Sequence, residues 1–168
     1  SITSLTGGTV NDIAISGNYI YAATRNLGVA IINATTANAP TLVSFVSNFY
    51  GEGVAADGNV MGQSTWDKVY LFDITSPESP ALRDSIILTT GTGEFCISGN
   101  YAYIHDYDTL RIYDISDLSN VVTLGKAYTG GSWDGTVFVE GNYAYANAET
   151  NGLRVFDIID KSNPVEVA

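Results

Sequence analysis

The chain repeats itself four times. Four stretches read almost alike, with glycines at Gly17, Gly58, Gly99 and Gly141: SGNYIYAA, DGNVMGQS, SGNYAYIH and EGNYAYAN. A second motif follows each of them and ends at Asn33, Asp73, Asp114 and Asp157: VAIIN, VYLFD, LRIYD and LRVFD. A third recurring position comes after the second motif, at Pro40, Pro80, Val121 and Pro164. Four copies of a unit of about 41 residues predict four copies of one supersecondary structure.

Each unit has the pattern of four short β-strands. In the first unit we expect strands at 11–16, 19–23, 29–33 and about 42–47. The Gly17-Asn18 pair predicts a two-residue hairpin turn, because both residue types tolerate positive φ at the central positions. Four antiparallel strands repeated every ~40–45 residues are typical of a β-propeller blade. The sequence therefore predicts an all-β fold, a propeller of four-stranded antiparallel blades with four blades in the chain.

The sequences of these motifs resemble those of the LVIVD repeat family. The units of that family read approximately G-N-Y-A-Y-V-A-D, then G-L-R-V-I-D-I-S, then D-P-S-N-P. Residues 141–167 are the closest copy, and residues 99–124 follow, without the final proline. Residues 17–43 match less well, and residues 58–82 match least. The family is associated with bacterial and archaeal proteins that are secreted or held at the cell surface. The resemblance implies that location and a propeller fold, but no activity.

The two ends of the chain look like halves of one strand. Joining them gives NPVEVASITSLTGGTVNDIAISGN, which aligns with SPALRDSIILTTGTGEFCISGN inside the chain. We therefore expect Ser1–Thr6 to complete the outer strand of Pro164–Ala168, in one propeller domain spanning 1–168. Its blades are predicted at about 7–47, 48–88, 89–128 and 129–168 plus 1–6.

Strand completion leaves three arrangements open. The ends can pair within one molecule, between two chains that build one eight-bladed ring, or within a longer polypeptide of which this chain is half. Four blades are the tight limit for a ring, because the inner strands crowd its axis. Completion by a partner also covers strand edges that would otherwise promote aggregation. A homo-oligomeric ring is therefore favoured over a closed four-bladed monomer.

The charge of the chain restricts the classes of partner that it can bind. It has 18 acidic and 7 basic side chains, and its formal net charge is −11. Nucleic acid is excluded as a partner because phosphate binding requires a basic surface. The same charge opposes binding to anionic membrane surfaces, and no apolar run approaches the ~18 residues that membrane insertion requires. Cys96 is the single cysteine, which excludes an internal disulfide, and we expect its thiol to be buried.

The connections between strands form a constant set and a variable set. Turns between strands one and two, and between three and four, keep nearly the same length in every unit. The other connections vary, and aromatic residues beside carboxylates on variable loops are typical of binding surfaces. The alternative is that these residues cover gaps between blades. The candidate ligand-binding residues are Tyr50, Trp66, Asp106, Tyr107, Asp108, Tyr128 and Trp133.

An acidic residue lies near the start of the first strand in each unit. The four residues are Asp12, Glu52, Glu94 and Asp134. In a propeller this position faces the mouth of the central channel, where several carboxylates could surround a metal ion such as Ca²⁺. Their alignment drifts between units, and the chain has no EF-hand loop. A structural or solubilising role is favoured, so we expect no cofactor, with Ca²⁺ as the alternative.

The sequence carries no motif of a catalytic site. It lacks a G-x-S-x-G elbow, a P-loop and a dinucleotide fingerprint, and its one histidine, His105, is expected at the rim of the propeller. We therefore expect a non-catalytic module for protein–protein interaction or assembly. A carbohydrate- or cation-binding, lectin-like propeller is the alternative, since aromatic platforms stack on sugar rings. A third, weaker hypothesis is that the chain is a hydrolase that uses carboxylates of its loops.

Overall fold

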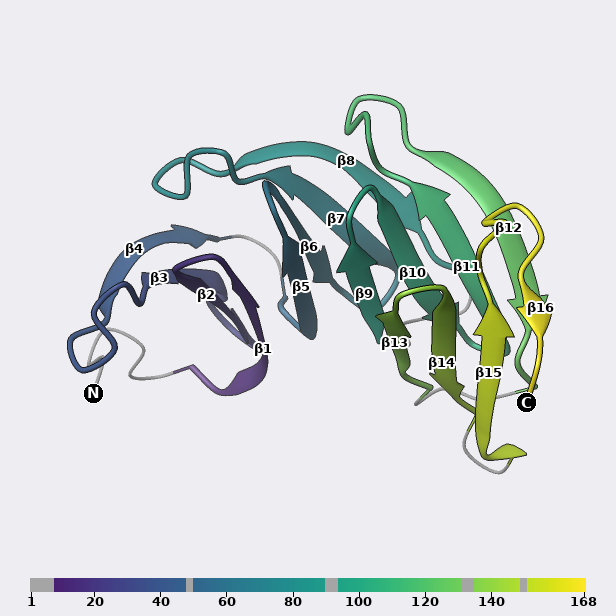
Figure 1. Cartoon of the computed structure of the whole chain (residues 1–168). Coiled ribbons are helices and arrows are strands. Elements are labelled where there is room, and N and C mark those ends of the chain that lie inside the picture. Colours follow the sequence, from purple (N-terminus) through teal and green to yellow (C-terminus); the bar gives the residue numbers. More distant parts are fainter. Residues whose placement is uncertain (1–7, 48–49, 90–93, 131–134, 149–150) are drawn as a thin grey trace. The chain divides into compact units, whose positions relative to one another are not determined.

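The elements are all β-strands in the residues that this computed structural model describes, namely 8–47, 50–89, 94–130, 135–148 and 151–168 (Figure 1). Within these ranges no helix is long and apolar enough to cross a membrane. The chain separates into two compact units. The first unit is formed by Ser1–Thr65 and Val69–Ser85, and the second by Trp66–Lys68 and Ile86–Ala168.

The described strands form four sheets, each with its strands in sequence order. The first sheet consists of β1 (Val10–Ser16), β2 (Tyr19–Thr24), β3 (Gly28–Asn33) and β4 (Thr41–Val46). The second consists of β5 (Gly53–Asp57), β6 (Val60–Ser64), β7 (Lys68–Asp73) and β8 (Ala81–Ile87). The third consists of β9 (Phe95–Ser98), β10 (Tyr101–Asp106), β11 (Thr109–Asp114) and β12 (Val122–Tyr128). The fourth consists of β13 (Val137–Glu140), β14 (Tyr143–Asn147), β15 (Leu153–Asp157) and β16 (Val165–Glu166).

These sheets confirm the predicted all-β fold of four-stranded antiparallel repeats. The strands expected in the first unit of the sequence agree with β1 to β4 to within one residue at each end. The outer strand of the fourth sheet is short, and it extends through the contact between Val155 N and the carbonyl oxygen of Ala168, at 2.7 Å. Ser1–Thr6 lies outside the described residues, so completion of this strand stays a prediction.

Each sheet begins with the same hairpin turn. Its glycines, Gly17, Gly58, Gly99 and Gly141, have φ angles of 56°, 54°, 56° and 58°. The asparagine after each glycine does not share this conformation, because Tyr107 is the one non-glycine residue with positive φ among those described. The left-handed conformation is thus needed at the first central position alone, as in a type II′ turn, and not at both as the sequence suggested.

The second motif ends in an Asx turn in every sheet. The side chain of Asn33 accepts a hydrogen bond from Thr35 N at 2.9 Å. The same contact recurs from Thr75 N to Asp73, Ser116 N to Asp114 and Ile159 N to Asp157. The bond from Thr75, helped by an ion pair with Arg83, lowers the pKa of Asp73 to about 2. These local bonds explain why an Asn or Asp recurs at this position, and they make this side of each sheet a constant scaffold.

The main core of each unit lies between its two sheets. In the first unit it contains Tyr21, Ala23, Val29, Ile31 and Val46 from the first sheet, and Val54, Met61, Phe72 and Ile74 from the second sheet and the turn after β7. In the second unit it contains Tyr103, Leu110 and Ile112 from the third sheet, and Val137, Ala144, Ala146, Phe156 and Ile158 from the fourth sheet and the turn after β15. Burial of each large side chain contributes roughly 1.5–3 kcal/mol, so face-to-face apolar packing holds the sheets of a unit together.

Candidate functional site

The variable connections lie together on one side of each unit. In the second unit, the carbonyl oxygen of Asp108, between β10 and β11, accepts hydrogen bonds from Thr129 N at 2.7 Å and Gly130 N at 3.3 Å, after β12. In the first unit, the guanidinium of Arg25, between β2 and β3, lies 5.8 Å from the ring centroid of Tyr50, after β4. The alternation of strand direction places these connections at the same end of the sheets, opposite the constant turns.

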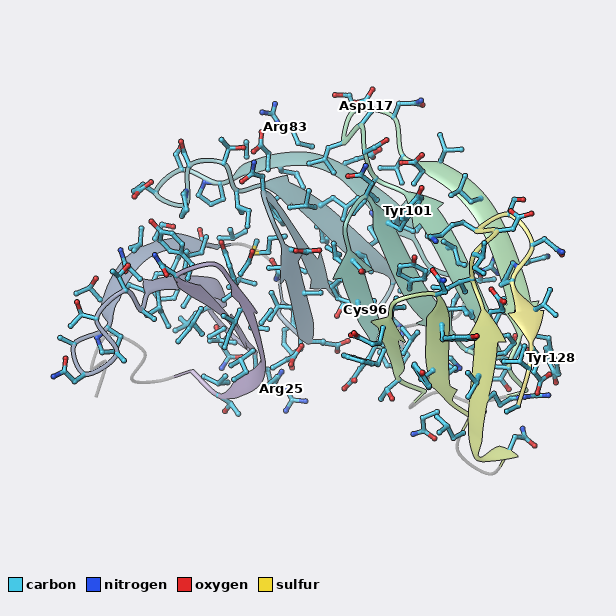
Figure 2. All side chains as sticks on the ribbon, viewed as in Figure 1. Arg25, Arg83, Cys96, Tyr101, Asp117 and Tyr128 are labelled. Atoms are coloured by element: carbon cyan, nitrogen blue, oxygen red, sulfur yellow. The ribbon has the colours of Figure 1, made fainter. Side chains whose placement is uncertain are left out.

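Three of the predicted aromatic residues belong to the variable side of the second unit. Trp66 is 62% exposed. Tyr128, at the end of β12 and labelled in Figure 2, is 66% exposed. Tyr107 is also exposed, and its φ of 61° is strained for a residue with a side chain. Tyr128 pairs across the sheet with Thr109, the residue that ends the turn of Tyr107. Tyr107, Asp108 and Tyr128 are therefore neighbours on one end of the third sheet.

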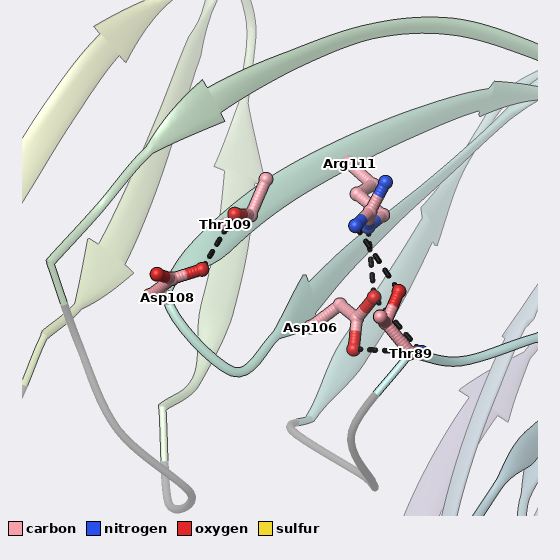
Figure 3. Close-up of polar contacts among 5 residues, drawn as sticks. All are labelled: Thr89, Asp106, Asp108, Thr109 and Arg111. Carbon is pink, nitrogen blue, oxygen red and sulfur yellow. Dashed lines mark hydrogen bonds and ion pairs between the residues drawn. The ribbon is translucent and has the colours of Figure 1, made fainter.

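Asp106 does not lie on the surface, contrary to the expectation of an exposed binding residue. It is buried, and its Oδ2 accepts a hydrogen bond from Arg111 Nε at 2.8 Å (Figure 3). The same carboxylate accepts bonds from Thr89 N at 3.1 and 3.2 Å, and Arg111 also donates to Thr89 Oγ1 at 3.1 Å. Asp106 thus joins the chain after β8 to the hairpin of β10 and β11. These bonds hold the two loops together.

His105 and Cys96 are also part of the scaffold. His105, expected at the rim, is fully buried in β10, where its Nε2 lies 3.0 Å from Thr129 Oγ1. Cys96 lies in β9 against the core of the second unit (Figure 2). Cys96 is partly buried rather than fully buried as predicted, and desolvation raises the pKa of its thiol to about 12. A thiol with this pKa stays protonated at neutral pH and is a poor nucleophile.

The acidic residues at the start of the first strands make backbone contacts where the structure describes them. Asp12 Oδ2 accepts a hydrogen bond from Val54 N, and Asp12 Oδ1 accepts one from Ile13 N, both at 2.8 Å. The backbone NH of Glu52 bonds Ser64 O, and that of Glu94 bonds Gly135 O. The described part of the chain contains no group of three His, Cys, Asp or Glu residues placed to hold a metal ion. Asp134 and Trp133 lie outside it, and the ring of carboxylates stays a prediction.

Sequence reasoning missed the two arginines that support the variable side. Arg154 occupies the position of Arg111 in the next sheet, and it forms a two-bond ion pair with Glu166 at 2.8 Å. It also donates to Thr129 O at 2.8 Å. The signal was present in the LRIYD and LRVFD motifs, where arginine interrupts an otherwise apolar strand. A long cation at such a position needs a carboxylate within reach, and Asp106 and Glu166, which lie outside the two motifs, supply it.

The repeated four-stranded antiparallel sheets define the class of the molecule as a β-propeller protein. The sequence profile of the LVIVD repeat matches residues 7–47, 92–129 and 131–168, which is more than half of the chain. The chain therefore belongs to the LVIVD repeat family, as its motifs indicated. Residues 58–82, the copy with the weakest motifs, lie outside the matched segments. A comparison with curated proteins finds no match.

Solved structures share the fold at low sequence identity. A functionally unknown protein from Desulfotomaculum acetoxidans DSM 771 has a TM-score of 0.78 and 16% identity, over 95% of this chain and 55% of that one. The periplasmic gluconolactonase PpgL of Pseudomonas aeruginosa has a TM-score of 0.72 and 15% identity, over 96% and 53%. The computationally designed Ika4 protein has a TM-score of 0.72 and 12% identity, over 94% and 95%. The chain spans about half the length of the two natural proteins.

Proposed function

We propose that the chain is a non-catalytic propeller module that binds another protein through the exposed aromatic residues of its second unit. The observation that carries this proposal is that Trp66, Tyr107 and Tyr128 are all exposed on the variable side of that unit. Aromatic side chains provide large contact areas and lose little conformational entropy, so they dominate the energetics of many protein interfaces.

The support beneath these residues favours a surface that is rigid before it binds. The ion pair of Asp106 with Arg111 anchors the turn that carries Tyr107, and the bond from Thr129 N to Asp108 O anchors the chain after Tyr128. A surface that is already ordered loses less entropy when a partner binds. The strained φ of Tyr107 is consistent with a side chain held in place for contact.

The absence of catalysis is part of the proposal. A catalytic acid, base or nucleophile needs access to its substrate and a pKa suited to the working pH. The described candidates of the second unit are engaged elsewhere: Asp106 with Arg111, and His105 with Thr129. Cys96 has a pKa far above neutral. These contacts favour a structural role for all three residues.

The charge of the chain indicates the chemistry of the partner. Asp67 and Asp108 lie next to Trp66 and Tyr107 in sequence, and the net charge is −11. We therefore propose a partner surface with an apolar centre and lysine or arginine around it. Association with such a partner weakens as salt screens the charges, within a Debye length of about 8–10 Å at 0.10–0.15 M.

Selection of peptides from a phage-displayed library on the immobilised chain tests this proposal. The variant Tyr107→Asn/Tyr128→Ala removes both rings, and asparagine tolerates the positive φ at position 107. We expect selected peptides to be rich in basic and apolar residues and to bind this variant at least roughly tenfold more weakly. The control Leu82→Ala shortens an exposed side chain of β8 and should bind normally. Peptides that bind both variants equally well would overturn the proposal.

A lectin-like function is the second candidate, because the same aromatic rings could stack on sugars. If the chain binds sugars on a glycan array and Tyr107→Asn/Tyr128→Ala abolishes this binding, the ligand is a carbohydrate and not a protein. Hydrolysis of gluconolactone is the matching test for catalysis, since one protein of this fold is a gluconolactonase. Turnover that Asp108→Asn abolishes would contradict the non-catalytic reading. Calorimetric titration with CaCl₂ tests whether the predicted ring of carboxylates binds Ca²⁺.

We also propose that the protein is secreted or held at the cell surface. The support for this location is the association of LVIVD repeats with such proteins. Immunodetection in fractionated source cells should find the chain in the medium or on the surface. Detection confined to the cytosol would contradict the location and leave the binding surface untouched.

A further inference from the structure

Within the second unit, the third and fourth sheets pack through two complementary faces. The third sheet contributes Cys96, Tyr101, Tyr103, Leu110 and Ile112, and the fourth sheet contributes Val137, Val139, Ala144 and Phe156. Leu110 is 0% exposed and Val137 is 7% exposed as a result. The first unit uses the same repeat positions, with Tyr21, Val29 and Ile31 against Val54, Met61 and Phe72. One kind of face-to-face contact therefore recurs in both units.

The fourth sheet presents one of these two faces without a neighbour in its unit. Phe138, Tyr143 and Leu153 occupy the repeat positions of Cys96, Tyr101 and Leu110, and all three are exposed. Leu153 is 65% exposed, against 0% for its counterpart Leu110. Cross-strand pairing of Phe138 with Tyr145, and of Tyr145 with Val155, places these side chains on the same face.

The first sheet presents the complementary face. Ile13 and Ile15 occupy the positions of Val137 and Val139, and they project from the face opposite Ala14, which packs on the core of the first unit. Ile13 is 59% exposed, against 7% for Val137. Ile13 pairs with Ala22 and Ile15 with Ile20. Ala22, Ala30 and Ile32 are buried on this same face, so the exposed part of the face is its edge at Ile13 and Ile15. Exposed apolar faces of this kind mark interaction sites.

The outer strands also take part in the contact between the two sheets of a unit. In the first unit, Ser44 Oγ donates a hydrogen bond to Pro77 O in the turn of the next sheet, at 2.6 Å. In the second unit, Gly125 occupies the position of Ser44, and its backbone lies against the carbonyl oxygen of Lys161, the counterpart of Pro77. Ala168 and Ala37 hold these two positions in the fourth and first sheets. The two open faces thus match the packed faces in register, with larger apolar side chains at Phe138, Ile13 and Ile15 than at Cys96, Val137 and Val139.

We propose that the open face of the fourth sheet docks on the open face of the first sheet in a second copy of this chain. The argument for this occupant is continuity with the packing inside each unit, because a copy supplies the complementary face at the same repeat positions. Two chains of four sheets give eight, which lies within the usual range of propellers. The contact uses residues that the proposed binding of a protein partner does not use, so the two proposals succeed or fail separately.

Sedimentation equilibrium and light scattering of the 168-residue chain test this docking. We expect a mass of two chains, each of 17.9 kDa, at micromolar concentration. Each chain has a net charge of −11, so added salt should strengthen the association by screening repulsion. A charge in the apolar contact should weaken it by roughly tenfold or more, so Ile15→Glu and Phe138→Glu should each give monomers. Leu82→Glu, on exposed β8, is the matched control and should remain paired.

A mixture of the two variants makes the test specific. Each variant keeps the face that the other has lost, so an equimolar mixture of Ile15→Glu and Phe138→Glu restores one intact contact and should again give pairs. Recovery also shows that both variants are folded. A monomeric parent chain at 100 µM, association that neither variant reduces, or a mixture that stays monomeric while both variants keep the β-sheet circular dichroism of the parent would each overturn the proposal.

Discussion

Replacement of Gln63 by methionine should stabilise the protein. Gln63 lies in β6 with 0% of its surface exposed, between Val54 and Tyr70 in the sheet register. Neither Nε2 nor Oε1 of its amide has a hydrogen-bonding partner among the described residues. The other three repeats place Ala22, Ile104 and Ala146 at this position. The first unit therefore buries a polar side chain where the repeat otherwise has an apolar one.

The size of the effect follows from the cost of burying polar atoms. In proteins an unsatisfied buried amide costs about 1–3 kcal/mol. Methionine is as unbranched as glutamine and similar in length, so the core should accept it without a large cavity. We expect Gln63→Met to raise the free energy of unfolding by about 1–3 kcal/mol. For a chain of this size, the melting temperature rises by roughly 2–4 °C per kcal/mol.

Urea unfolding followed by circular dichroism measures the change. The midpoint should rise while the slope with urea stays constant, since the surface exposed on unfolding is unchanged. Gln63→Glu is the contrasting variant: it buries a charge, so it should be destabilised at pH 7 and recover as the pH falls and the carboxyl is protonated. A Gln63→Met protein less stable than the parent by 1 kcal/mol or more would refute the reasoning, because it would mean that the amide makes favourable bonds.

Three further variants or reactions test the scaffold. The Cys96 thiol has a pKa of about 12, above its ordinary value, so its contribution to the stability of the folded state is complete below pH ~9 and declines above it. At pH 8 a thiol reagent should react at least roughly 100-fold faster with the chain in urea than with the native chain. Equal rates in the two conditions would contradict burial of the thiol. Gly28→Ala places a methyl group against the carbonyl oxygen of Val46, at a residue whose φ is 86°. The free energy of unfolding in urea should fall by more than about 2 kcal/mol. An unchanged urea midpoint would contradict this prediction. Asp106→Asn should cost about 2–3 kcal/mol, less than a fully buried pair because Arg111 is partly exposed, and a double-mutant cycle with Arg111→Met should give a coupling energy distinguishable from zero.

The repeated part of the fold was predictable because its causes are local. The Gly-Asn turn, the Asx turn at Asn33 and the alternation in the strands are each set by residues within a few positions of one another. Asp106 shows the limit of this reasoning. Its burial depends on Arg111 in the next strand and on Thr89 in the chain after β8, and no local pattern joins the three. His105 is misplaced for the same reason, since its contact with Thr129 crosses 24 positions of sequence.

The bond that closes each constant turn has a consequence for how the chain folds. The carbonyl oxygens of Asn18, Asn59, Asn100 and Asn142 each accept a bond from the residue that follows the third strand, namely Ala34, Ile74, Ile115 and Ile158. This bond ties the hairpin to the exit of the third strand, so three strands are linked within a short segment. Contacts of low sequence separation form quickly. The first three strands of each repeat can therefore form early, and packing against the neighbouring sheet then stabilises them.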